Sequence, residues 1–103
     1  MNPLSVAISP CPNDTFIFGA WILGLTAAPA DRDCRFFWHD VQVLNQGALE
    51  GTWDVVKVSA ATALRLRDSY AILPCGGAFG LEHGPKLVTR GGFRGEPRTV
   101  AVP

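Results

Sequence analysis

The chain has 103 residues, of which 48% are hydrophobic and 17% are charged, a composition typical of one small globular domain and not of a disordered segment. Nine basic and nine acidic side chains give a formal net charge of zero at pH 7. The molecule as a whole therefore has no electrostatic attraction to nucleic acid or to an anionic membrane.

The cysteines indicate neither a disulfide framework nor a zinc site. They are odd in number and widely spaced, and no C-x-x-C motif or His/Cys cluster occurs among them: Cys11, Cys34 and Cys75. A reducing, cytoplasmic compartment fits this pattern best.

An apolar stretch at residues 16–25 is too short to cross a bilayer, which takes about 20 residues. It is not the core of a signal peptide either, because the first basic residue, Arg32, comes after it. We expect a buried helix here. A later basic stretch has cations at four-residue intervals, but glycines and Pro97 interrupt it, so a solvated loop is expected rather than a nucleic-acid-binding helix.

Short runs rich in apolar residues predict the strands. In chain order these runs are residues 4–8, 34–38, 54–58, 70–73, 86–89 and 99–102.

Segments between these runs predict helices. Residues 15–25 should form one, with Asn13 or Asp14 as its N-cap and Gly24 near its end. Because this segment is apolar nearly all round, we expect it to be covered on more than one side. Asp40 and Ser59 are the expected N-caps of two further helices, which run through residue 50 and to about residue 67.

Strands that alternate with helices on short connections predict βαβ units, and hence an α/β fold with a mostly parallel sheet. Ligands bind to such sheets beyond the carboxyl ends of the strands, near the point where the strand order reverses. Residues 9–14, Ser59 and residues 76–80 each follow an expected strand. We therefore expect these loops at one edge of the sheet, where a ligand would bind.

The polar residues of these loops have two interpretations each. Asn13, Asp14 and Ser59 either cap their own helices or belong to a site where free N–H groups at helix starts attract a carboxylate. Asp14 would repel an anion, so we expect it to accept hydrogen bonds from ligand hydroxyls or from backbone N–H groups of its own loop. Lys57 either extends to solvent or places a cation beside Ser59.

Several stretches resemble the 1,4-dihydroxy-6-naphthoate synthase family of the futalosine route to menaquinone. They are SPCPNDTFIF at residues 9–18, DVQVLNQGALEGTWDVVKVSAA at 40–61, GGAFG at 76–80, GPKLV at 84–88 and VAVP at 100–103. The resemblance implies a type II periplasmic-binding-protein-like fold, in which a cleft separates two α/β lobes. It also implies a lyase that converts cyclic dehypoxanthinyl futalosine to 1,4-dihydroxy-6-naphthoate without an organic cofactor.

The resemblance also assigns site residues. Lys57, Val58 and Ser59 match the family's substrate-binding stretch, and Asn13 and Asp14 match its first loop, which would form one wall of the substrate cleft. The partner implied is a small-molecule substrate, with no nucleic acid and no membrane.

The sequence departs from the family's pattern in two ways. Residues 82–85 read Glu-His-Gly-Pro where the family often has Gly-x-Gly-Pro, and the family's chains are considerably longer. Its carboxylate-binding threonines and its histidine base lie beyond Pro103, and neither His39 nor His83 matches that base.

The resemblance therefore implies the amino-terminal portion of a first lobe, with the second lobe absent, no catalytic residue of its own and no activity alone. Hydrophobic surface left exposed by the missing lobe would favour self-association. A non-catalytic cytoplasmic binder of a small carboxylated aromatic ligand is the alternative, because the same fold serves solute capture.

Overall fold

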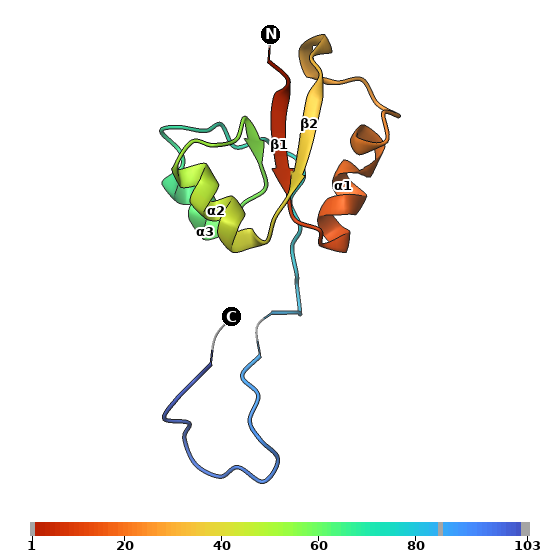
Figure 1. Cartoon of the computed structure of the whole chain (residues 1–103). Helices are drawn as coiled ribbons and strands as arrows, with labels where there is room; N and C mark the ends of the chain where they lie inside the picture. The colour runs from red at the N-terminus through yellow and green to blue at the C-terminus, as the bar shows by residue number, and fades with distance from the viewer. Residues whose placement is uncertain (1, 85, 102–103) are drawn as a thin grey trace.

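The computed structural model describes residues 2–84 and 86–101 of the chain, and its helices and strands all lie in the first two-thirds (Figure 1). In chain order they are β1 (Leu4–Ile8), α1 (Pro12–Ile22), a 3₁₀ turn (Pro29–Asp31), β2 (Cys34–Trp38), α2 (Val41–Leu49), β3 (Val55–Val56) and α3 (Ala60–Arg65).

The strands form a parallel sheet in the order β2-β1-β3. Val6 at the centre of β1 is paired with Phe36 of β2 on one side and with Val55 of β3 on the other. β3 is shorter than residues 54–58, although the N–H of Lys57 extends its ladder by donating to the carbonyl oxygen of Ala7 at 3.0 Å. The predicted α/β class and parallel sheet are confirmed.

Helices lie on both faces of the sheet, α1 on one side and α2 with α3 on the other (Figure 1). Alternate residues of β2 show the same division, because successive side chains of a strand point to opposite faces. Phe36 packs edge-on against Trp21 of α1, with ring centroids 5.3 Å apart. Phe37 packs at 5.1 Å against Trp53, which precedes β3.

The core is the central strand together with one face of α2. Val6 and Ile8 are fully buried, and Leu44 and Ala48 of α2 are each 1% exposed. The expected N-cap of α2 is confirmed, since Asp40 Oδ1 accepts from two backbone N–H groups of the first turn, at 2.8 and 3.2 Å.

α1 begins earlier than the sequence predicted, and the expected N-cap was wrong. Cys11 is the N-cap and Pro12 the first helical residue, a position that suits proline because its fixed φ matches the helix and its missing N–H is not needed there. Asn13 and Asp14 consequently lie inside the first turn. Ser59 is the N-cap of α3, as predicted, although α3 ends before residue 67.

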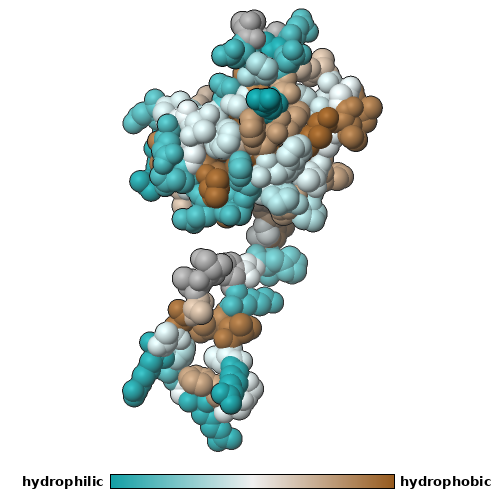
Figure 2. All heavy atoms as spheres, viewed as in Figure 1, coloured by the Kyte–Doolittle hydropathy of each residue, from teal (hydrophilic) through white to brown (hydrophobic). Residues whose placement is uncertain are grey.

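α1 is also less covered than its composition predicted. Only Asp14 among its residues is buried, whereas Phe16 is 87% exposed. Leu23 and Leu25, just beyond the helix, are 73% and 75% exposed, and Figure 2 shows hydrophobic surface on this side of the α/β unit. Within the described residues one face of α1 meets the sheet and the other meets solvent. Apolar side chains are therefore exposed on and just after α1, and both a missing lobe that would cover them and self-association through them stay predictions.

The strands expected after α3 were wrong wherever the structure describes them. Residues 70–73, 86–89 and 99–101 form no strand, and Val102 lies outside the described residues. The backbone of Tyr70 is used differently, because its N–H donates to the carbonyl of Leu66 at 2.8 Å and closes a turn after α3. Residues 86–101 form an open loop away from the sheet (Figure 1), as expected for the basic stretch. No helix of the described residues is long and apolar enough to cross a membrane.

Candidate functional site

Two of the expected loops meet at the carboxyl edge of the sheet. Residues 9–14 follow β1 and residues 57–59 follow β3, and these parallel strands are neighbours. With the order β2-β1-β3, the chain turns to opposite sides of β1 at this point, which is the switch point where open α/β sheets bind ligands. Residues 76–80 do not follow a strand. Gly76 instead lies beside α1, where an added Cβ would be 3.7 Å from Ile17.

Asp14 ties the first loop together. Its Oδ2 accepts hydrogen bonds from the backbone N–H of Ser9 at 3.0 Å and from the Ser9 hydroxyl at 2.9 Å. The Ser9 oxygen in turn accepts from the N–H of Cys11 at 3.3 Å. The structure thus confirms that Asp14 accepts hydrogen bonds within its own loop. Because its carboxylate lies in the first turn of α1 and offsets the positive end of the helix dipole, a second anion is disfavoured at that helix start.

Lys57 connects the two loops through an ion pair with Asp14. Its Nζ lies 3.6 Å from Asp14 Oδ1, and the two side chains are 25% and 8% exposed. The cation is therefore held at the switch point and is not simply extended to solvent. Its partial exposure leaves it accessible to an anionic ligand.

Ser59 is held by side chains from both sides. Its hydroxyl oxygen accepts from Asn45 Nδ2 at 3.2 Å and from the N–H of Thr62 at 3.4 Å, and the hydroxyl donates to Thr62 Oγ1 at 3.0 Å. The contact with Thr62 N–H confirms that Ser59 caps its helix. Sequence reasoning missed Asn45 and Thr62. The position of Thr62, three residues after the Ser59 cap, was an available signal, whereas the contact of Asn45 with Ser59 depends on how α2 packs.

The remaining predicted site residues have weaker positions. Val58 is half-buried between Lys57 and Ser59. Asn13 is exposed at the second position of α1, and its side chain makes no hydrogen bond within the described part of the chain. The structure therefore brings Asp14 and Lys57 into contact, with Asn13, Val58 and Ser59 adjacent to them along the chain.

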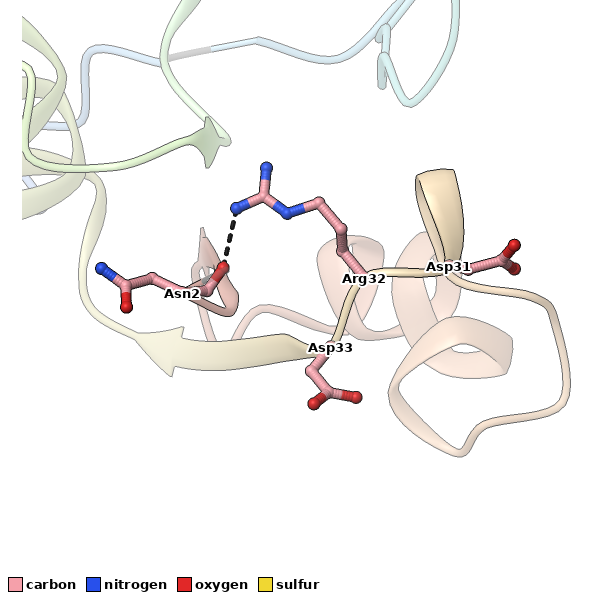
Figure 3. A pocket seen from close by; sticks show the side chains of 4 residues that line it. All are labelled: Asn2, Asp31, Arg32 and Asp33. Carbon is pink, nitrogen blue, oxygen red and sulfur yellow. Dashed lines mark hydrogen bonds between the residues drawn. The ribbon is translucent and has the colours of Figure 1, made fainter.

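Two hollows lie elsewhere, and none of the predicted site residues lines them. One, of about 230 Å³, lies between Asn2 and Asp31–Asp33 at the amino end of β1 and β2; Arg32 Nη2 donates there to the carbonyl oxygen of Asn2 at 2.7 Å (Figure 3). The other, of about 620 Å³, lies within the loop of residues 86–101. We favour the carboxyl edge as the site, because ligands of parallel α/β sheets bind there and not at the amino ends of the strands.

Among the described residues, no group of three or more His, Cys, Asp or Glu side chains could hold a metal ion. The ring of His39 packs on Trp53 with centroids 5.6 Å apart, which agrees with a structural role. His83 is exposed in the loop after residue 80.

Comparison with known proteins identifies the family. A family model described as menaquinone biosynthesis matches residues 4–103. The chain belongs to this family. It is similar to the 1,4-dihydroxy-6-naphthoate synthase of Streptomyces coelicolor, with 45% identity over 105 residues that cover 99% of this chain and 36% of that enzyme. It is also similar to the Thermus thermophilus enzyme of the same name, with 42% identity over 104 residues that cover 100% of this chain and 38% of that enzyme.

The chain thus spans little more than a third of the length of these curated relatives. No solved structure matches it. The resemblance seen in the sequence motifs is confirmed at the level of the family.

Proposed function

We propose that the protein acts in menaquinone biosynthesis as a 1,4-dihydroxy-6-naphthoate synthase, a carbon–carbon lyase that acts on cyclic dehypoxanthinyl futalosine. The family match and the relatives with 42% and 45% identity support this assignment. In this proposal residues 1–103 are the amino-terminal portion of the first lobe of a type II periplasmic-binding-protein-like fold. The second lobe lies outside these residues, and the enzyme works in the cytoplasm without an organic cofactor.

The observation that carries the proposal is that a cation and a hydroxyl, Lys57 and Ser59, lie on one short segment at the switch point. Lys57 and Ser59 follow β3 directly, and both side chains can donate a hydrogen bond to a carboxylate. A hydrogen bond that involves an ionised group is stronger than one between two neutral groups. Asp14 holds the Lys57 ammonium from the opposite loop. These residues bind and orient a carboxylated substrate, with Asn13 and Val58 beside them on the cleft wall.

The proposal assigns substrate binding to these residues and assigns the proton acceptor of the reaction to none of them. Binding of carboxylated aromatic compounds by the natural gene product without turnover would favour the non-catalytic binder instead.

Replacement of Ser59 by alanine in the natural gene product tests the site. Loss of one hydrogen bond to a charged group should raise KM by about 10-fold, with kcat within about twofold. The rate of 1,4-dihydroxy-6-naphthoate formation gives both constants. A melting curve measures the stability lost with the helix cap, about 1 kcal/mol, and so separates it from the loss of substrate binding. Ser69→Ala is the control, because among the described residues its hydroxyl donates to the carbonyl of Leu66 alone, at 3.3 Å. An unchanged kcat/KM for Ser59→Ala removes Ser59 from the site.

A further inference from the structure

One side chain on α2 holds both polar groups of Ser59. Asn45 Oδ1 accepts from the Ser59 backbone N–H at 3.0 Å, and Asn45 Nδ2 donates to the Ser59 hydroxyl oxygen at 3.2 Å. The two residues are 14 positions apart in the chain, on α2 and at the start of α3. A single amide therefore fixes where the Ser59 oxygen lies relative to the sheet.

α2 gives this amide a fixed position. Leu44, the residue before Asn45, is 1% exposed, and so is Ala48 one turn further along. Asp40 caps the helix start. Because these groups anchor α2 against the sheet, Asn45 has little freedom to follow Ser59 if the loop shifts, and the loop is held to the helix instead.

The hydrogen bonds also determine what Ser59 can offer a ligand. A serine hydroxyl has one proton to donate and two lone pairs that accept. Asn45 Nδ2 and the N–H of Thr62 occupy the acceptor positions, and the proton is directed to Thr62 Oγ1. Because both acceptor positions are filled by N–H groups, the proton is the one part of the Ser59 hydroxyl that can turn, from Thr62 Oγ1 to an oxygen of a ligand.

We propose that Asn45 is a positioning residue for substrate binding, which keeps the Ser59 hydroxyl as a hydrogen-bond donor to a carboxylate beside Lys57. This inference rests on the proposed function. On binding, the Ser59 proton turns from Thr62 Oγ1 to a carboxylate oxygen, while Asn45 keeps its two contacts with Ser59. No covalent bond forms or breaks in this step.

A double-mutant cycle of Asn45→Ala and Ser59→Ala in the natural gene product tests the inference, with cyclic dehypoxanthinyl futalosine as the probe. Asn45→Ala should raise KM by about 5-fold in the wild-type background and by less than about twofold in the Ser59→Ala background, because residues that act through one contact are not additive. In both backgrounds kcat should stay within about twofold of its reference value.

Asn45→Asp provides a variant that preserves the fold. Its carboxylate still accepts from the Ser59 N–H, but it replaces the amide donor by an acceptor that captures the Ser59 proton. KM should therefore rise by about 10-fold or more while the melting temperature stays near that of the wild type. Gln42→Glu adds the same charge at an exposed position of α2 and should leave KM unchanged, which controls for simple repulsion of the substrate.

The outcomes separate this inference from the proposed function. A raised KM in Ser59→Ala together with unchanged KM values in both Asn45 variants overturns the inference and leaves the proposed function intact. An equal KM increase for Asn45→Ala in both backgrounds also overturns it, because Asn45 would then act without Ser59. An unchanged KM in Ser59→Ala overturns both.

Discussion

Gly47 of α2 lies so close to Trp53 that a single methyl group there should measure how firmly the indole is held. A Cβ added at Gly47 would collide with Trp53 Nε1 and lie 3.2 Å from two further ring atoms. The ring cannot move freely, because Phe37 and His39 pack against it with ring centroids 5.1 and 5.6 Å away. Gly47→Ala therefore overpacks the interface of α2 with the segment that leads into β3.

The size of the effect follows from two opposing contributions. Alanine stabilises a helix interior by about 1 kcal/mol relative to glycine, and overpacking of this kind costs about 1–3 kcal/mol. Gly19 in α1 is the matched control, because an added Cβ there meets nothing within 4 Å. Gly19→Ala should therefore raise the free energy of unfolding by about 1 kcal/mol, and Gly47→Ala should fall below Gly19→Ala by about 1–3 kcal/mol.

Urea unfolding of the two variants and the wild type gives these differences directly, provided that the m-value is unchanged. A difference of 1 kcal/mol should also appear as about 4–8 °C in the melting temperature of a domain of this size. If Gly47→Ala proves as stabilising as Gly19→Ala, Trp53 does not fill the space above Gly47, and the packing of α2 described above is wrong.

Two further predictions concern carboxylates. Asp14→Asn keeps an oxygen for Ser9 but removes the charge opposite Lys57, so it should lower the free energy of unfolding by about 1–3 kcal/mol. Urea unfolding should show a smaller loss when Asp14→Asn is made in a Lys57→Met background. An equal loss in that background would contradict the ion pair. The backbone N–H of Ser5, and then its hydroxyl, lower the pKa of Asp54, so the stability that this contact contributes is present above the unfolded-state pKa and is lost as the pH falls through the lower folded-state pKa. The stability difference between wild type and Asp54→Asn should therefore shrink as the pH falls below about 4, and a constant difference down to pH 2 would refute this role of Ser5.

Local sequence signals predicted the elements whose determinants are local. Sequence analysis placed β1, β2 and the Asp40 cap correctly. The signals used, which are a run of apolar residues for a strand and a capping side chain for a helix, each lie within a few residues of the chain. The start of α1 was misplaced, because Pro12 suits the first helical position better than Asn13 or Asp14 suits the cap.

Elements that depend on distant partners could not be read in this way. The apolar run at residues 70–73 resembles a strand, yet Tyr70 donates through its hydroxyl to the carbonyl of Trp53 at 2.6 Å and through its N–H to Leu66. A strand exists only where a neighbouring backbone accepts its hydrogen bonds, and sequence alone does not show which neighbour is available.

The sequence predicted those residues of the candidate site whose positions follow from the sheet topology. Parallel strands place the ends of β1 and β3 at one edge, so Asp14, Lys57 and Ser59 could be expected together. Asn45 could not, because its contact with Ser59 depends on how α2 is rotated and how far it extends over the sheet. Such details are determined by packing and not by any short motif.

β3 is a short strand, and this has a consequence for motion at the site. Its ladder with β1 pairs two residues, whereas the ladder of β1 with β2 pairs five. Local opening of a structure costs less free energy where few backbone bonds and buried contacts must break. Residues 57–59 can therefore detach from the sheet while β1 and β2 stay paired, and such an opening must break the backbone bond from Lys57 to Ala7 and the side-chain contacts from Asp14 and Asn45.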